Sequence, residues 1–265
     1  EEQQAAVERF TDEFSGGKRG IYLLHGITGS GKTETYMEMI EEVVSAGKQV
    51  IVLIPEIALT YQTVMRFYRR FGDIVALVNS KMSKGERFDQ FLRAERGEAS
   101  IMIGPRSALF TPFSNLGLII IDEEHEHAYK SENVPRYHAK EVATVRAELA
   151  GASIVLGSAT PSVSDYYRAK QGEYTLLTLN RRAVENSELP EVEVIDLREE
   201  LQSGNKQIFS RRLTELIEDR LEKKEQIMLF LNRRGYSGFI SCRSCGKSVK
   251  CDHCDVSMTM HRDGK

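Results

Sequence analysis

The residues with the clearest chemistry lie in one short stretch, Gly26 to Thr33, which reads G-x-x-x-x-G-K-T. This spacing is typical of the phosphate-binding loop of ATP and GTP enzymes, because its glycines let successive backbone N–H groups point inward at phosphate oxygens. The lysine brings a positive charge within reach of the outer phosphates, and the threonine hydroxyl can bind Mg²⁺. We therefore expect a nucleotide site at Gly26, Thr28, Gly29, Ser30, Gly31, Lys32 and Thr33.

A second set of reactive side chains, Asp122-Glu123-Glu124-His125, follows an apolar run roughly ninety residues after Lys32. A carboxylate at the end of a buried strand can hold the Mg²⁺ that the threonine also binds, and we assign Asp122 that role. Its neighbour Glu123 can orient and deprotonate an attacking water. Lys32, Asp122 and Glu123 are thus the catalytic candidates for nucleotide hydrolysis.

An amide side chain just before the phosphate loop, Gln3, can bracket an adenine ring with paired donor and acceptor groups. A glutamine that simply faces solvent fits the same position equally well. Gln3 is therefore a candidate adenine contact with this alternative left open.

Residues 129–138 interleave aromatic and basic side chains beside the acidic stretch. Tyrosine can stack on a base and lysine or arginine can pair with a phosphate, so the loop suits single-stranded nucleic acid. A loop whose tyrosines pack on the core is the alternative. Ser158-Ala159-Thr160 is either a plain turn or a hydroxyl relay. The candidates for contact with nucleic acid are Arg106, Tyr129, Lys130, Arg136, Tyr137, His138, Ser158 and Thr160.

The four cysteines form two C-x-x-C pairs near the end of the chain, Cys242 with Cys245 and Cys251 with Cys254. Each pair can give zinc two thiolates, and the clustering favours a metal site in a reducing compartment, the cytoplasm, over disulfides. Zinc ribbons usually separate their pairs by about fifteen to twenty residues, more than these pairs allow. Either both pairs hold one zinc, or each awaits a partner pair beyond Lys265, which we favour.

Short apolar runs alternate with amphipathic segments through the first two thirds of the chain, which predicts an α/β fold with a parallel sheet and helices on both faces. Ligands of such sheets gather at the carboxyl ends of the strands, where the phosphate loop, the acidic stretch and the Ser-Ala-Thr triplet all fall. The expected strands are 21–24, 50–54, 74–78, 99–103, 118–121 and 154–156. The expected helices are 2–14, one opening directly after the loop, 57–71, 84–96 and 138–150.

The pattern changes near residue 178, where a polar, turn-like stretch over 180–189 suggests a hinge. Beyond it we expect a strand at 192–197, a helix at 211–223 and a strand at 226–231, the start of a second α/β unit. The predicted domains are residues 1–180 for nucleotide binding, 181–240 for the linker and second unit, and 241–265 for the zinc-binding segment.

Composition narrows the class of protein. The chain has 265 residues, 41% of them hydrophobic, as expected for a globular protein. Its net charge of −3 does not indicate binding to nucleic acid, but it does not exclude it, because a basic groove can be local. Its apolar runs are too short for a membrane span, and we expect neither a span nor a secretory signal. Because it opens on Glu1 rather than Met, we expect a fragment of a longer protein.

These motifs together resemble the superfamily-two DNA helicases, and among them the bacterial replication-restart helicases. The stretches that carry the resemblance include GITGSGKTETY, LIIIDEEHEHAYK, VLGSATPS and FLNRRGYSGFISCRSCGKSVKCDHC, and they span nearly the whole chain. The resemblance implies a RecA-like motor lobe and an ATP-driven 3′→5′ helicase that uses Mg²⁺ and two zincs. It also implies that Gln3 reads adenine and that His125, Ser158 and Thr160 couple hydrolysis to DNA.

The implied partners are single-stranded and forked DNA, single-stranded-DNA-binding protein, and the primosome or replicative-helicase-loading proteins. Pro105, Tyr61 and Lys81 depart from the residues usual in that family, and a second-lobe arginine finger lies beyond this sequence. We expect the fragment to bind nucleotide but hydrolyse it poorly. The alternatives are a P-loop phosphotransferase and a non-catalytic, zinc-dependent nucleic-acid-binding module.

Overall fold

A computed structural model describes the chain except for residues 184–189, 231–241, 243–246, 249, 252 and 254–265. The chain forms two compact units, unit 1 over Glu1–Ser187 and unit 2 over Glu188–Lys265. All residues of the expected nucleotide site belong to unit 1, so this unit is the one that matters for the chemistry.

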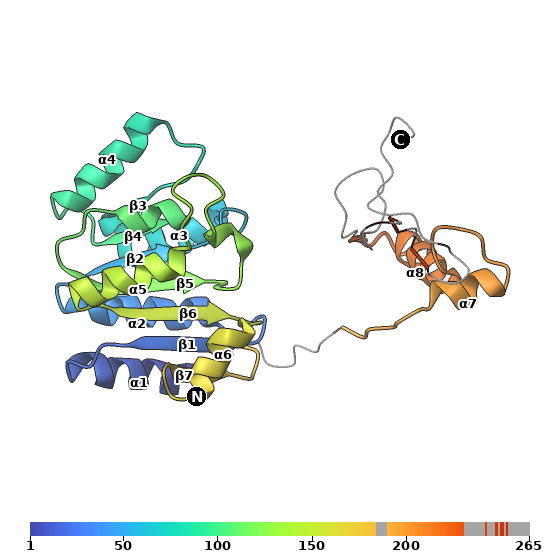
Figure 1. Cartoon of the computed structure of the whole chain (residues 1–265), viewed down its shortest axis with the longest axis horizontal. Helices are drawn as coiled ribbons and strands as arrows, with labels where there is room; N and C mark the ends of the chain where they lie inside the picture. The colour runs from blue at the N-terminus through green and yellow to red at the C-terminus, as the bar shows by residue number, and fades with distance from the viewer. Residues whose placement is uncertain (184–189, 231–241, 243–246, 249, 252, 254–265) are drawn as a thin grey trace. The chain divides into compact units, whose positions relative to one another are not determined.

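Unit 1 is built on a seven-stranded sheet in which every strand pairs parallel to its neighbours, in the order β3-β4-β2-β5-β6-β1-β7 (Figure 1). The strands are β1 Ile21–Gly26, β2 Gln49–Leu53, β3 Val75–Leu77, β4 Ile101–Gly104, β5 Leu116–Asp122, β6 Ser153–Ser158 and β7 Thr175–Leu179. The predicted α/β fold with a parallel sheet is confirmed, with its first six strands at the apolar runs. The edge strand β7 is an addition that the sequence analysis did not include.

The helices that link these strands are α1 Glu2–Ser15, α2 Lys32–Ser45, α3 Tyr61–Phe71, α4 Lys84–Glu95, α5 Ala139–Ala150 and α6 Val163–Lys170. The predicted start of α3 at residue 57 is wrong. The Thr60 side chain accepts the backbone N–H of Thr63 at 3.2 Å and so caps the helix four residues later. Ile57 lies before that cap and is 88% exposed, so its apolar side chain does not belong to the core.

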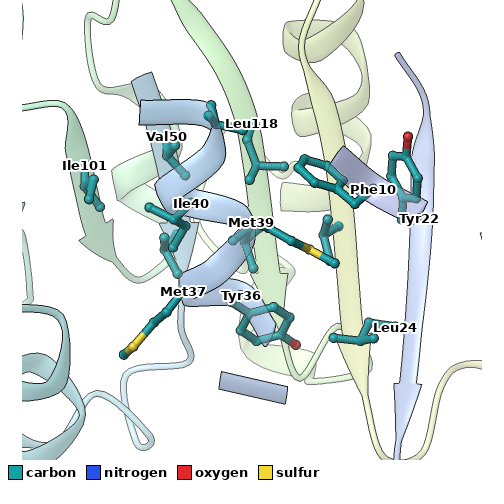
Figure 2. Packing of buried hydrophobic residues seen from close by; sticks show 14 of the residues in the cluster. Phe10, Tyr22, Leu24, Tyr36, Met37, Met39, Ile40, Val50, Ile101 and Leu118 are labelled. Carbon is teal, nitrogen blue, oxygen red and sulfur yellow. The ribbon is translucent and has the colours of Figure 1, made fainter. Parts of the chain in front are cut away.

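Two apolar clusters cover the two faces of the sheet, because successive strand residues point to opposite sides. On β2, Val50 and Val52 belong to the cluster that also holds buried residues of α1 and α2. Ile51 and Leu53 belong to the other cluster, with buried alanines of α5. Figure 2 shows Met39 and Ile40 of α2 packed over the first of these faces. Helices on both faces are therefore confirmed.

Unit 2 contains the helices α7 Leu197–Gln202 and α8 Arg211–Glu222, and the second of these confirms the predicted helix at 211–223. The predicted strand at 192–197 is wrong, because residues 191–196 have no regular structure and α7 begins at Leu197. The strand predicted at 226–231 is also absent over 226–230, and Leu231 lies outside the described residues. Among the helices described in either unit, none combines the length and apolar composition needed to cross a bilayer.

Candidate nucleotide and nucleic-acid site

The glycine-rich stretch forms the turn between the end of β1 at Gly26 and the start of α2 at Lys32. Gly29 and Gly31 have φ angles of +79° and +88°, values that a side chain would strain. The Lys32 ammonium donates to the Gly26 carbonyl at 2.9 Å, so the lysine lies back across the loop. The start of α2 and this ammonium both present positive charge at the loop, which suits an anion such as phosphate.

Gln3 of α1 contacts the loop directly. Its side-chain amide donates to the carbonyl of Ser30 at 2.7 Å. A Cβ atom at Gly31 would lie 2.0 Å from the Gln3 nitrogen, so a side chain there would displace the Gln3 amide as well as strain the backbone. The structure thus brings Gln3 to the edge of the phosphate loop, while its role as an adenine contact stays a prediction.

The chain segment after β7 also reaches the loop. The backbone N–H of Ala183 donates to the Gly29 carbonyl at 2.8 Å. Nearby, one carboxylate oxygen of Glu2 accepts the N–H groups of Asn180 and Arg181 at 2.7 and 3.0 Å. The first turn of α1, the loop and the segment at 180–183 are therefore joined by hydrogen bonds.

The acidic stretch lies two strands from the loop on the same edge of the sheet, since β6 pairs with both β1 and β5. Gly157 of β6 aligns with Leu24 on one side and with Asp122 on the other. Tyr36 of α2 crosses this strand and donates its hydroxyl to Asp122 Oδ1 at 3.0 Å. A Cβ at Gly157 would lie 1.5 Å from that hydroxyl, so glycine leaves the path open. Sequence analysis missed both residues, although Tyr36 follows Lys32 by one helical turn.

The charge state of Asp122 depends on its burial and on its charged neighbours. Burial is the largest influence and raises the pKa of this carboxyl, and the neighbouring charge of Glu123 raises it further. The Tyr36 hydrogen bond and the positive charge of Lys32 act in the opposite direction but do not cancel the increase. An ion of positive charge bound here would favour the carboxylate form. Glu123 itself has a φ of +47°, a backbone conformation that costs a non-glycine residue about 1–2 kcal/mol.

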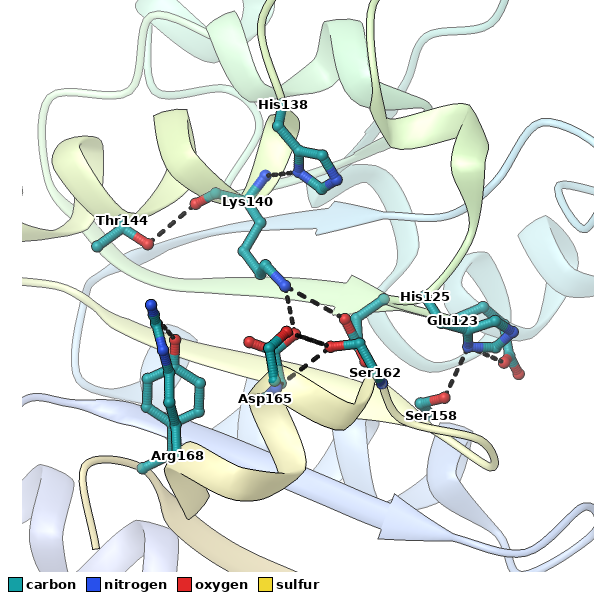
Figure 3. A network of polar contacts seen from close by, with 12 residues as sticks. Glu123, His125, His138, Lys140, Thr144, Ser158, Ser162, Asp165 and Arg168 are labelled. Atoms are coloured by element: carbon teal, nitrogen blue, oxygen red, sulfur yellow. Dashed lines mark hydrogen bonds and ion pairs between the residues drawn. The ribbon is translucent and has the colours of Figure 1, made fainter. Parts of the chain in front are cut away.

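His125 and Ser158 lie together beside Glu123 (Figure 3), and Thr160 contacts the same imidazole. His125 Nδ1 is 2.7 Å from the Ser158 hydroxyl, and its Nε2 is 3.5 Å from the Thr160 hydroxyl. The same Nδ1 lies 3.7 Å from a Glu123 oxygen. One imidazole therefore touches both the acidic stretch and the Ser-Ala-Thr triplet, the contact that a coupling role requires.

The 129–138 loop is anchored at its start by Tyr129. This tyrosine is buried, and its hydroxyl donates to the carbonyls of Asp122 at 2.6 Å and Leu53 at 3.0 Å. In this conformation the ring lies in the core, which favours the alternative of a packed tyrosine, and contact of Tyr129 with nucleic acid stays a prediction. The guanidinium of Arg106 donates to the carbonyls of Ala128 and Lys130, so it supports the start of the loop.

The remaining candidates of this loop are accessible. Residues 132–136, among them Arg136, are exposed, as is Lys130, while Tyr137 and His138 are half-buried. The Tyr137 ring meets the exposed ring of Phe110 edge to face, with 5.5 Å between centroids. The loop thus presents aromatic and basic groups at its surface, and contact with nucleic acid stays a prediction for them.

The cysteine prediction falls mostly outside the described residues, which include Cys242 and Cys251 but not Cys245 or Cys254. The Cys242 backbone N–H donates to the Lys247 carbonyl at 2.8 Å. Within the part of the chain that the structure describes, no cluster of three or more histidine, cysteine or acidic side chains could hold a metal ion. The predicted zinc site is therefore not seen among these residues.

The chain is similar in sequence to one family of known proteins and to several individual proteins. The sequence model of the family described as "Type III restriction enzyme, res subunit" matches residues 1–163. The chain is 52% identical over 265 residues to "Replication restart protein PriA" of Bacillus subtilis, covering 100% of this chain and 33% of that protein. It is 46% identical over 244 residues to the protein of the same name from Synechocystis, covering 90% of this chain and 29% of that protein. The chain thus spans about a third of the length of these relatives.

Proposed function

We propose that this chain is the ATP-binding motor part of a DNA helicase that restarts replication. The chain belongs to the family described as the res subunit of type III restriction enzymes, and this membership is the starting point of the proposal. The observation that supports this most is the bond from Tyr36 to Asp122. It links the helix that opens at Lys32 to the acidic stretch, so that the two motifs of a nucleotide hydrolase face one edge of one sheet. The name shared by the relatives supports replication restart as the process.

The donor set fits a magnesium nucleotide. A threonine hydroxyl and a carboxylate are oxygen ligands of the kind that Mg²⁺ takes, and Thr33 and Asp122 would hold the ion. When bound, magnesium would neutralise charge on the phosphates. Lys32 would pair with the outer phosphates, the loop N–H groups would bind the others, and Glu123 would orient the attacking water and accept its proton. Gln3 would contact the adenine.

The proposal extends to the DNA. Arg106, His125, Ser158, Thr160 and residues 129–138 would couple hydrolysis to a bound single strand, giving 3′→5′ movement on stalled or repaired forks. The proposed partners are forked DNA, single-stranded-DNA-binding protein and primosome or helicase-loading proteins. Residues 1–180 would form a RecA-like first motor lobe, 181–240 the linker and the start of a second lobe, and 241–265 the first half of a two-zinc insertion.

One assay tests the proposal in the full-length protein that contains this sequence. ATP hydrolysis is measured with and without single-stranded and forked DNA for wild type, Lys32→Ala and Lys84→Ala. Lys84 is a matched control, because it is the first residue of α4 as Lys32 is of α2, and it is exposed. We expect Lys32→Ala to lower DNA-stimulated hydrolysis at least about a hundredfold, since it removes a charge from the phosphate site, and Lys84→Ala to match wild type.

Other results would direct the assignment elsewhere. Hydrolysis that is indifferent to DNA would favour a phosphotransferase with a small-molecule acceptor. DNA binding without nucleotide hydrolysis, unchanged in Lys32→Ala, would favour the zinc-dependent nucleic-acid-binding module.

A further inference from the structure

Four polar side chains that the proposed function does not use form a largely buried network, which begins in the acidic stretch at Glu124 (Figure 3). The side chains of Glu124 and Asp165 are only 1% and 2% exposed. The Lys140 ammonium pairs with Asp165 and lies 3.5 Å from Glu124 Oε2. Ser162 joins the same carboxylates, because its N–H donates to Glu124 Oε1 at 2.7 Å and its hydroxyl to Asp165 Oδ2 at 2.6 Å.

The members of this network come from three elements that all border the candidate site. Glu124 directly follows Asp122 and Glu123, and its N–H donates to the Gly157 carbonyl at 3.0 Å. Lys140 lies in the first turn of α5. Ser162 caps α6 just beyond the Ser-Ala-Thr triplet. The network thus connects the acidic stretch, the start of α5 and the chain that follows the triplet.

Lys140 supplies the positive charge of this network. Burial alone would raise the pKa of Asp165, but hydrogen bonds from Lys140 and Ser162 outweigh it and lower that pKa. Burial opposes the charge of Lys140, yet the partner carboxylates raise its pKa. The pair is therefore ionised at neutral pH. Glu124 is a second buried acid against the same ammonium, since the Lys140 Nζ lies 3.5 Å from its Oε2. A single cation serves two buried acids.

Lys140 is also tied to the end of the 129–138 loop. The backbones of Lys130 and His138 form an isolated antiparallel bridge, and the Ser131 N–H donates to the Tyr137 carbonyl at 2.8 Å. His138 then caps α5, with its Nδ1 accepting the Lys140 N–H at 3.3 Å. The bridge between Lys130 and His138 closes the base of the loop, and Lys140 follows His138 by two residues. A displacement of the exposed part of the loop would therefore also displace Lys140.

We propose that Lys140 is a positioning residue through which the 129–138 loop sets the placement of both the acidic stretch and the Ser-Ala-Thr triplet. The inference rests on the proposed function, because it presumes that the loop meets a single strand while the acidic stretch hydrolyses nucleotide. In this role Lys140 acts through its hydrogen-bonded partners and needs no contact of its own with the nucleotide or the single strand. Its ammonium contacts Glu124 of the acidic stretch and Asp165, which is bonded to Ser162 after the triplet. A movement of the first turn of α5 would therefore shift the acidic stretch and the triplet together.

The test compares hydrolysis by the full-length protein with and without oligo-dT for wild type, Lys140→Met, Lys140→Arg and the control Lys18→Met. Lys18 also pairs with a carboxylate, Glu13 at 2.9 Å, but is 58% exposed. We expect the ratio of stimulated to unstimulated rates to fall about tenfold in Lys140→Met. The ratio stays within about twofold of wild type in Lys140→Arg and Lys18→Met, as does the oligo-dT affinity of Lys140→Met by fluorescence anisotropy.

A role in stability alone would lower both rates by the same factor and leave the ratio unchanged, and that result overturns the proposal. If Lys140→Met does not fold, the double variant Lys140→Gln with Asp165→Asn takes its place, because a neutral amide pair replaces the ion pair and leaves no unpaired carboxylate at position 165. An unchanged ratio there overturns the proposal, and a reduced ratio supports it. If DNA does not stimulate hydrolysis by wild type, or if Lys32→Ala hydrolyses ATP fully, the proposed function is refuted. The proposal for Lys140, which rests on that function, then fails with it.

Discussion

Replacing Gly157 by alanine is the most direct test of the geometry that joins the phosphate loop to the acidic stretch. The new methyl group would lie 1.5 Å from the Tyr36 hydroxyl and 2.6 Å from its Cζ, and both residues are buried. Tyr36 must then move away from Asp122 and lose its hydrogen bond. Overpacking costs about 1–3 kcal/mol, and a lost bond to a buried carboxylate about 1.5–3 kcal/mol. We expect a loss of about 3–5 kcal/mol in the free energy of unfolding.

The assay is urea denaturation followed by circular dichroism, with Tyr36→Leu and the double variant completing a double-mutant cycle. Tyr36→Leu removes the ring that the methyl group would meet, so alanine at position 157 should cost at least about 1.5 kcal/mol less in that background. Gly151→Ala is a poor control because its φ is +61°, whereas Gly20 has open space around a Cβ and an ordinary φ. Gly20→Ala should therefore unfold like wild type. Equal costs of Gly157→Ala with and without Tyr36 would refute the reasoning.

Two further predictions concern charge and metal. Because hydrogen bonds from Lys140 and Ser162 lower the pKa of Asp165 against the effect of burial, its contribution to stability is present above the unfolded pKa of about 3.9 and is lost as the pH falls through the lower, folded value. The difference in unfolding free energy between wild type and Asp165→Asn should accordingly shrink between pH 5 and pH 2.5, and a constant difference would contradict this. If the cysteine pairs hold zinc in the full-length protein, elemental analysis should find two zincs per chain, and fewer in Cys242→Ser. Equal zinc in both would argue against the cysteine assignment.

Much of unit 1 is predictable from local sequence because its strands are buried on both faces. Runs such as 118–121 have apolar side chains on both sides of the sheet, so they differ from the amphipathic helices around them. The phosphate loop and the acidic stretch were equally predictable, since each depends on residue types at fixed spacing. Their joint position at one sheet edge follows from the parallel order of the strands.

The features that sequence analysis missed depend on contacts between distant segments. Nothing local marks Gly157 as the crossing point of Tyr36, or decides between a Tyr129 ring in the core and one against a base. The strand predicted at 192–197 is wrong because its local preference lacks a partner. Val192 and Val194 favour strands, but their side chains are exposed, and among the described residues their backbones pair with no neighbouring strand.

The hydrogen bonds at Glu2 and Ala183 set the limits of any shortened version of unit 1. Deleting the first three residues would remove the Glu2 carboxylate and the Gln3 amide together, and stopping at residue 180 would remove the donor to Gly29. Neither truncation removes a residue of the sheet, but each removes a hydrogen bond to a backbone carbonyl of the glycine turn. A shortened protein meant to bind nucleotide should therefore keep both Glu2 and Ala183, three residues past the boundary that sequence pattern alone suggests.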